Sequence, residues 1–388
     1  WSIDEIKSIL SKEEFDEFEL WFDLSQFTNF EGSHIIRYKN IKNINPNEYT
    51  RINSITSKLY HARDKRIPPL TDNKILLSWN SLLLTSFLEA GDVFNEKKYS
   101  KAGIALADYL YSHFIKNNEL YRVSIDNQLE ARAIFEDYAY LSNGLLSVFD
   151  YTLEDVWLDR VISLVNTMNE RFWDDSNYGF NISDDNKYIN SSLKESYDGA
   201  IPSTNGIAYK LLLGLNERTN NKTYTDQAQK ILSAFASEIN SNPYNYSTFI
   251  FGFNDYSKGE LGNIQYAYQG RIRVHTKKLD DKHVVVKLTL KPKWHINSSS
   301  PLQGNLIATS IENIDTKNWS LLEIEYPKAR LVKLGFSDEE ISVYENQIDI
   351  HIKIKNNSTK FTNPSLNLIL QACSDKVCLP PTNINLRP

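Results

Sequence analysis

The feature that most constrains this chain is a change in the spacing of its apolar residues near residue 255. Before that point, apolar side chains recur every three or four residues, which is the period of an α-helix with one buried face. After it they alternate with polar residues, which is the period of a half-buried β-strand. The sequence therefore predicts a helical part followed by an all-β part, and 388 residues suffice for both.

The helical part repeats one unit: a helix, a short polar turn, an aromatic anchor and a second helix. The anchors are Tyr99, Trp157 and Tyr224. Between the helix pairs, segments 120–123 and 173–180 carry the aromatic and turn-forming residues typical of small β-hairpins. Stacked helical hairpins with long loops at one end predict an (α/α) toroid, whose loops line a central cleft.

Polar residues interrupt the helical pattern at the starts of three inner helices. They are Asp72, Lys74, Trp79 and Asn80 at the first, Glu136, Asp137 and Tyr138 at the second, and Glu195, Asp198, Ser203 and Asn205 at the third. In a toroid all three groups open into one cleft. Carboxylates and aromatic rings are what a sugar site needs, for acid–base chemistry and for stacking on a pyranose. The same residue types are ordinary helix caps, so capping or packing is the alternative for each of them.

The β part contains clear alternating segments, at 271–275, 284–290, 321–326, 348–354 and 366–370. Their spacing predicts a β-sandwich. We expect a helical domain over residues 1–255, a linker at 256–267 and the sandwich over 268–388. The first 65 residues or so add shorter helices, such as one over 12–22, to the helical domain.

The chain has two cysteines, Cys373 and Cys378, and turn-forming residues 374–376 between them allow the sulfurs to join. Three interpretations stay open: an exchange-active pair, a structural bridge and a metal site. A bridge that closes so short a loop adds only about 2 kcal/mol in the loop-entropy model. Zinc needs two more ligands, and the nearest histidines, His295 and His351, lie on other segments. The spacing therefore favours exchange, with Cys373 as the sulfur attacked because 379–381 shield its partner.

Composition argues against some partners. The net charge of -6 and the scattering of Lys and Arg among acidic residues disfavour a nucleic acid or an anionic membrane surface. No apolar run approaches the roughly 20 residues that cross a bilayer. We expect no cofactor and no metal. The chain opens on Trp1 rather than Met and has no signal-peptide pattern, so we expect a fragment or a processed form.

Part of the helical pattern is familiar, in the runs 69–80, 136–139, 173–175 and 194–205. These runs resemble the YyaL and spermatogenesis-associated protein 20 family over about residues 1–250. The resemblance implies an (α/α) six-hairpin barrel similar to N-acylglucosamine 2-epimerases, preceded by a thioredoxin-like domain that we expect upstream of Trp1. The sequence departs from the family at Ser81 and Thr204, where glycine is usual.

The β part is similar to the N-terminal periplasmic domain of DsbD in the segments 293–297, 326–327, 343–345 and 371–381. That resemblance implies an immunoglobulin-like sandwich that relays electrons by thiol–disulfide exchange. It makes Cys373 and Cys378 the catalytic redox pair, a thioredoxin-like domain or protein the partner, and the periplasm or another extracytoplasmic space the location. DsbD often has one more residue between its cysteines, so its partner and potential do not transfer.

The fold expected is thus an all-α toroid-like domain followed by an all-β immunoglobulin-like sandwich. The leading hypothesis is thiol–disulfide exchange through the cysteine pair. The first alternative is a carbohydrate-active enzyme, an epimerase or glycosidase, that uses Asp137, Glu195 and Asp198 in the toroid cleft. The second alternative is a non-catalytic scaffold with an inert disulfide.

Overall fold

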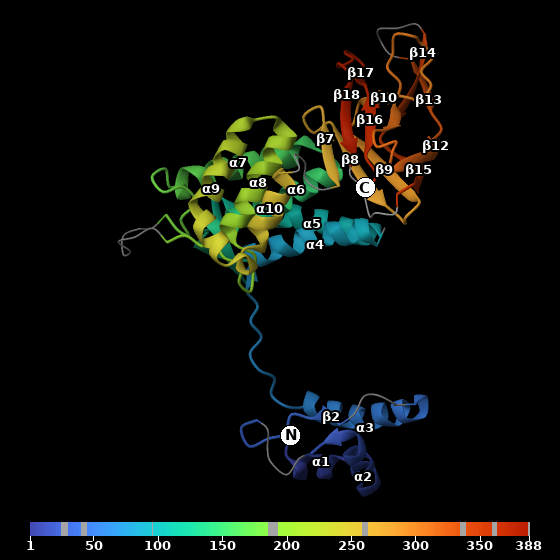
Figure 1. The fold of residues 1–388 in the computed structure, drawn as a ribbon. Coiled ribbons are helices and arrows are strands. Elements are labelled where there is room, and N and C mark those ends of the chain that lie inside the picture. The colour runs from blue at the N-terminus through green and yellow to red at the C-terminus, as the bar shows by residue number, and fades with distance from the viewer. Residues whose placement is uncertain are drawn as a thin grey trace. The chain divides into compact units, whose positions relative to one another are not determined.

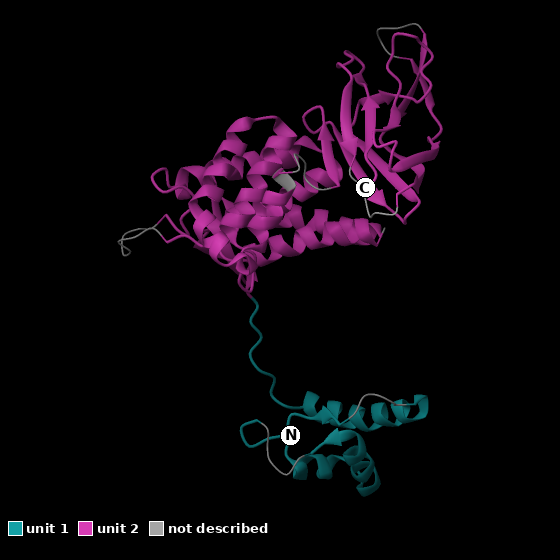
Figure 2. Cartoon of the chain, in the orientation of Figure 1, with its two compact units in different colours: residues 1–73 teal, residues 74–388 magenta. Residues whose placement is uncertain are grey.

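The computed structural model describes residues 1–24, 30–39, 45–94, 96–184, 193–257, 263–333, 339–358 and 363–386. They form two compact units, residues 1–73 and 74–388 (Figure 2). The sequence predicts a single domain over residues 1–255, whereas the structure gives the first 73 residues a core of their own around Ile6, Phe18 and Ile52. The physical reason lies in the stretch before residue 74, where Ile67 and Leu70 are fully exposed and join neither core.

The first unit consists of short helices with one apolar face. Its elements are α1 (Ile3–Ile9), α2 (Lys12–Trp21), β1 (Phe22–Asp23), β2 (Arg37–Tyr38) and α3 (Pro46–Asp64). Two helices begin at capping boxes, in which the side chains of Ser11 and Asn45 accept from the backbone while Glu14 and Glu48 reach back. These caps satisfy amides that a helix start leaves without partners. The helix predicted over 12–22 is α2.

The second unit opens with three helical hairpins. They are α4 (Leu77–Val93) with α5 (Lys97–Phe114), α6 (Phe135–Thr152) with α7 (Asp155–Phe172), and α8 (Thr204–Thr219) with α9 (Lys222–Ser241). A 3₁₀ turn (Pro243–Asn245) and α10 (Ser247–Ser257) follow. Helices α4, α6, α8 and α10 contact one another in series, and α5, α7 and α9 pack outside their partners (Figure 1). This is the (α/α) toroid-like architecture expected, and the described residues supply three hairpins of it.

Burial separates inner from outer helices. Helices α6 and α8 are buried on nearly every side, whereas α7 and α9 bury one stripe that includes Trp157 and Tyr224. The linking segments form the expected β-structure: β5 (Glu119–Ile125) pairs with β3 (Ile75–Leu76), β4 (Ile115–Lys116) and β6 (Gln128–Arg132). Trp173 and Phe180 form an antiparallel bridge. The linkers thus gather at the starts of α4 and α6.

The rest of the second unit is an all-antiparallel β-sandwich. One sheet has the order β12-β15-β9-β8-β7, with bounds Trp319–Glu325, Gln347–Asn356, His283–Leu290, Ile272–Lys278 and Ile264–Ala267. A second has the order β13-β14-β10-β17, with bounds Arg330–Lys333, Glu340–Glu345, Trp294–Asn297 and Ala372–Ser374. A third has the order β11-β16-β18, with bounds Ser310–Asn313, Leu366–Leu370 and Thr382–Leu386. The core between the sheets contains Val286, Ile296, Ile352 and Leu368.

Strand β7 lies inside the linker predicted at 256–267, so the sandwich begins earlier than expected. Residues 258–262 of that linker lie outside the described residues. A buried arginine fixes β7: Arg218 of α8 donates to both carboxylate oxygens of Asp150 in α6 and lies over the ring of Tyr266 in β7. A buried charge is stable only when its donors are paired, which they are here. This contact connects the helical hairpins to the sandwich.

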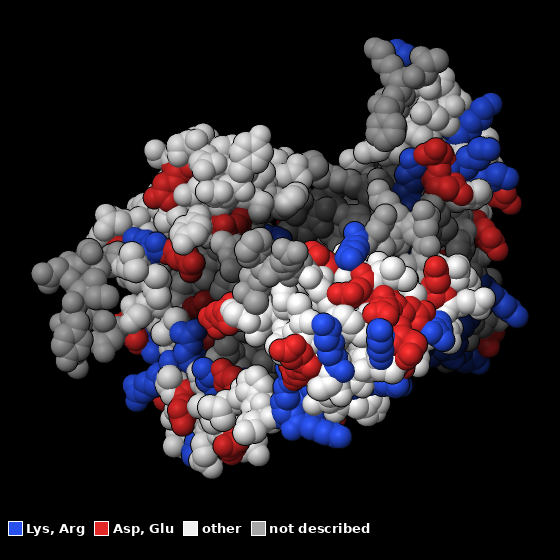
Figure 3. All heavy atoms as spheres, turned by 90° about the horizontal axis from the view of Figure 1, so that it is seen from below, with Lys and Arg blue, Asp and Glu red and all other residues white. Residues whose placement is uncertain are grey.

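Acidic and basic side chains are interspersed on the face of the molecule shown in Figure 3. No helix in the described ranges is both long and apolar enough to cross a bilayer. In the same ranges no three His, Cys, Asp or Glu side chains gather in a way that could hold a metal ion.

Candidate functional sites

The two cysteines form a disulfide at the end of strand β17. Cys373 and Cys378 lie with their Cα atoms 4.0 Å apart and form an antiparallel bridge. Between them the backbone N–H of Ser374 donates to the carbonyl of Val377 at 2.8 Å, which closes a tight turn. The turn predicted from residues 374–376 is therefore present, and the pair closes a hairpin of this chain.

Strand alternation places the disulfide on the face of the sheet away from the sandwich core. Ile296 of β10 and Ala372 of β17 are opposite each other and both belong to that core. Their neighbours His295 and Cys373 are also opposite each other, one residue along each strand. Because successive side chains point to opposite faces, His295 and Cys373 share the outer face.

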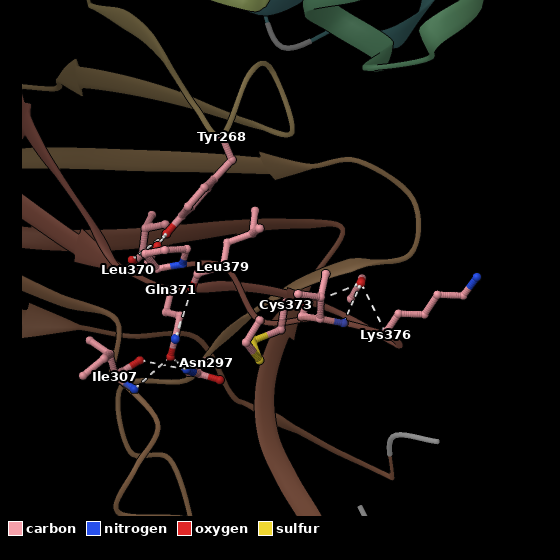
Figure 4. The surroundings of a disulfide bond; sticks show 12 residues. Tyr268, Asn297, Ile307, Leu370, Gln371, Cys373, Lys376 and Leu379 are labelled. Atoms are coloured by element: carbon pink, nitrogen blue, oxygen red, sulfur yellow. Dashed lines mark hydrogen bonds between the residues drawn. A yellow bond between two sulfur atoms is a disulfide. The ribbon is translucent and has the colours of Figure 1, made fainter. Parts of the chain in front are cut away.

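Hydrogen bonds hold the base of the cysteine hairpin (Figure 4). The side chain of Gln371 donates to the carbonyl of Leu379 at 3.1 Å and accepts from Asn297 at 3.0 Å and from the backbone of Ile307 at 3.2 Å. The hydroxyl of Tyr268, on the turn after β7, lies 3.1 Å from the carbonyl of Leu370 and 2.8 Å from that of Pro380. The base is therefore fixed from both sides of the pair.

Accessibility differs between the two cysteines. Cys373, which lies opposite His295 of β10, is 0% exposed. Cys378 is partly exposed, since it follows the turn whose residues Asp375 and Lys376 face solvent. The sequence favours Cys373 as the sulfur attacked, and this is wrong for accessibility, because Cys373 is fully buried and Cys378 is partly exposed.

His295 is a second titratable group beside the disulfide. It is 3% exposed, and its Nε2 atom has no hydrogen-bond partner among the described residues. Burial lowers its pKa, and the nearby carboxylates of Glu345 and Asp375 only partly oppose that effect. Sequence reasoning placed His295 on an unrelated segment, because separation along the chain says nothing about strand register. The alternation of β10 is the signal that could have placed it.

The polar residues at the start of α4 differ in their exposure. Asp72 lies in the first unit and Lys74 begins the second, and both side chains are exposed. Trp79 is 60% exposed. The side-chain amide of Asn80 donates to the carbonyl of Leu76 at 2.8 Å, one helical turn back. Of these residues, Trp79 offers a free aromatic face.

At the start of α6, Asp137 is buried with 0% of its surface exposed. One carboxylate oxygen accepts from the backbone N–H of Ile134 at 3.0 Å, and the other has no partner among the described residues. Burial raises the pKa of Asp137 to about 7, against the opposing charge of Arg122, whose Nε lies 3.7 Å away. Glu136 pairs with Arg122 at 3.2 Å. Tyr138 accepts a hydrogen bond from Arg171 at 3.0 Å, which is a structural role.

The starts of α6 and α8 converge on a second carboxylate. Burial raises the pKa of Glu195, and the negative charge of Glu136 raises it further. Thr204, at a position where the resembling family usually has glycine, donates to Glu195 at 3.5 Å. The Tyr140 hydroxyl of α6 donates to the carbonyl of Pro202, two residues before Thr204. Sequence reasoning did not include Arg122 or Tyr140, because neither starts a helix.

Three other predicted residues serve the backbone. Asp198 accepts hydrogen bonds from Ser203, Ser247 and Thr248, which together outweigh the effect of burial and lower its pKa. Ser203 caps α8 through the N–H of Gly206 at 3.0 Å. Asn205 is buried and bonds the backbone of Phe180 in both directions, at 2.8 and 3.1 Å. Capping, the alternative that the sequence left open, describes Asp198 and Ser203 in this structure.

Comparison with known proteins finds two different similarities. Residues 267–386 match the family model of thiol:disulfide interchange protein DsbD, N-terminal. The chain is also 28% identical over 206 residues to human spermatogenesis-associated protein 20, which covers 50% of this chain. It spans only 26% of the length of that curated relative. Both resemblances indicated by the sequence motifs are confirmed.

Solved structures resemble each part separately. The DsbD N-terminal domain of Neisseria meningitidis in the reduced form covers 32% of this chain and 90% of its own, at 13% identity and a TM-score of 0.24. A family 76 α-mannanase of Bacteroides thetaiotaomicron covers 55% of this chain and 64% of its own, at 13% identity and a TM-score of 0.41.

Proposed function

We propose that this chain performs thiol–disulfide exchange through Cys373 and Cys378. The observation that carries the proposal is the asymmetry of the pair: one cysteine is buried in a strand, and the other is partly exposed after a turn. An incoming thiol needs one reachable sulfur, and the second must stay close enough to leave and return. The match of residues 267–386 to a family described as a thiol:disulfide interchange protein supports the same chemistry.

The accessible sulfur defines the order of the steps. A partner thiolate attacks Sγ of Cys378, a new S–S bond forms to the partner, and the old bond breaks with its electron pair passing to Sγ of Cys373. A second thiolate of the partner then attacks the partner's own sulfur in the mixed disulfide and releases Cys378 as a thiolate. Both cysteines end reduced and protonated, and the partner dithiol ends as a disulfide. A thioredoxin-like domain or protein in an extracytoplasmic space is the partner that fits.

The test uses dithiothreitol as a dithiol probe on the folded oxidised protein, followed by alkylation and mass measurement. We expect two alkylated cysteines in native protein, and a reduction potential above about -300 mV, the region of labile rather than structural bridges. With glutathione disulfide, the reduced Cys373→Ser variant should form a mixed disulfide at Cys378. Reduced Cys378→Ser is the matched variant and should react far more slowly. A pair that resists reduction until the protein unfolds would contradict the proposal.

A second function has one observation in its favour, the carboxyl groups at the starts of α6 and α8. Asp137 has a pKa of about 7, which suits a general acid at neutral pH, and the pKa of Glu195 is also raised. Exposed Trp79 offers a stacking face. This set supports acid–base chemistry on a carbohydrate, as in an epimerase or glycosidase.

Titration with a broad panel of sugars tests the second function. Binding should be lost in Asp137→Ala and kept in Asp226→Ala, because Asp226 is exposed on α9. If none of the sugars binds, the carbohydrate function fails and the scaffold alternative remains.

A further inference from the structure

Three strands place a carboxylate, an imidazole and a sulfur in one row. Glu345 of β14 lies opposite His295 of β10, and His295 lies opposite Cys373 of β17. Directly opposite residues in an antiparallel pair share a face, with Cβ atoms about 4.5–5.5 Å apart. The row lies on the outer face of the sheet, the face that carries the disulfide.

The central member of this row has an unused polar atom. The Nε2 of His295 is buried and has no partner among the described residues. Such an atom costs free energy in the state of the protein that leaves it without a partner. In the oxidised protein the neighbouring Cys373 sulfur carries no hydrogen. In the reduced protein the Cys373 sulfur carries a hydrogen, and this S–H can donate to Nε2 of His295.

We propose that His295 accepts the proton of the Cys373 thiol when the reduced pair closes its disulfide. The inference rests on the proposed exchange function and identifies the proton acceptor of its closing step. This role explains why a histidine lies beside the disulfide, although an apolar residue there would leave no buried polar atom without a hydrogen-bond partner.

The closing step balances as follows. The reduced protein first reacts through the Cys378 thiolate with a disulfide, which gives a mixed disulfide at Cys378 and one free thiolate of the reagent. The Cys373 thiol then passes its proton to Nε2 of His295. The Cys373 thiolate attacks Sγ of Cys378, the intramolecular S–S bond forms, and the bond to the reagent breaks with its electron pair leaving as the second thiolate. The imidazolium gives its proton to water or to that thiolate.

The surrounding charges keep His295 able to accept. Glu345 faces it from β14 and Asp375 from the cysteine turn, and both favour the imidazolium once it forms. Arg330 of β13 pairs with Glu345 at 2.8 Å, and Lys376 lies in the same turn as Asp375. Burial is the larger effect and lowers the pKa of His295 below its ordinary value, so the ring is neutral at neutral pH.

The experiment follows the reaction of the reduced full chain with glutathione disulfide, quenched with acid at set times and read by mass. In the wild-type protein the mixed disulfide should close too fast to accumulate. In His295→Asn closing should be about a hundredfold slower at pH 7, the usual effect of a lost general base, so the mixed disulfide accumulates. The rate of its formation should not change. His351→Asn is the matched control, because His351 is exposed on β15 in the other sheet.

The pH profile distinguishes a proton acceptor from a packing role. In the wild-type protein the closing rate should fall as pH drops through the pKa of His295. In His295→Asn it should instead rise about tenfold per pH unit up to the thiol pKa, which is ordinarily about 8.5. Near-UV circular dichroism checks that the variant is folded, and His295→Gln provides a second replacement of larger volume.

Closing at the wild-type rate in both variants would overturn the inference, and so would slower closing with an unchanged pH profile. Either result leaves the exchange function intact. If glutathione disulfide does not oxidise the cysteine pair of the reduced wild-type protein at all, the exchange function itself fails, and this inference fails with it.

Discussion

Hydrogen bonds to backbone groups have different consequences at the starts of the inner helices and at the cysteine hairpin. At the helix starts, backbone N–H groups bind the carboxylates of Asp137 and Asp198, so each side chain is both a candidate catalyst and a cap. At the cysteine hairpin, hydrogen bonds from Gln371 and Tyr268 to backbone carbonyls hold the base, and these bonds do not involve the sulfur atoms. The comparison indicates that a reactive side chain stays available for chemistry where neighbouring residues, rather than the side chain itself, make the hydrogen bonds to the backbone.

The largest effect we expect concerns Asp137. Its folded-state pKa of about 7 lies above the ordinary 3.8, so the folded protein holds a proton that the unfolded chain releases. Stability should therefore fall as pH rises from about 4 to about 7, by up to about 4 kcal/mol at 1.36 kcal/mol per pKa unit. Urea unfolding at pH 4.5 and 7.5 measures this. Asp137→Asn should lose most of the pH dependence and exposed Asp226→Asn should keep it; equal dependence in the two variants would contradict the assignment.

Asp198 should behave in the opposite sense. Its pKa is lowered by hydrogen bonds, so its contribution is present above pH 3.8 and is lost as pH falls below that value. Asp198→Ala removes the acceptor for Ser203, Ser247 and Thr248 and should lower the free energy of unfolding by about 3 kcal/mol at pH 7. Asp226→Ala serves as the control. A loss below about 1 kcal/mol would mean that these caps are not structural.

Gln371→Ala tests the base of the cysteine hairpin. It removes one donated and two accepted hydrogen bonds, and we expect a loss of about 2 kcal/mol in the free energy of unfolding. Hydrogen exchange should become faster at Leu379, whose N–H bonds Ala372. Gln347→Ala, exposed at the start of β15, is the matched control. Unchanged exchange in Gln371→Ala would show that the hydrogen bonds of Gln371 do not hold the hairpin.

Tyr268→Phe should have the smallest effect, about 1 kcal/mol, because the ring stays and only the hydroxyl shared by Leu370 and Pro380 is lost. Thermal unfolding of this variant is compared with that of Tyr244→Phe, since Tyr244 is 93% exposed. Equal melting temperatures in the two variants would remove Tyr268 from the set of contacts that hold the base.

The sequence by itself determined the type and order of the elements. The apolar spacing predicted the helical hairpins and the alternating strands, because burial of one face imposes its period on the residues. The same spacing missed the separate unit of residues 1–73, since periodicity records that a face is buried and not what covers it. It also placed β7 in a linker.

Only the tertiary structure decided the chemistry of the candidate residues. Asp137 and Asp198 read alike as acidic residues near a helix start, yet one has a raised pKa and the other a lowered one. The sequence favoured Cys373 as the sulfur attacked, yet Cys373 is the cysteine that is completely buried and Cys378 is partly exposed. Strand register alone brings His295 opposite Cys373 across a wide gap in the sequence. The physical reason is that pKa and accessibility depend on the atoms around a group, and folding brings most of those atoms from distant parts of the chain.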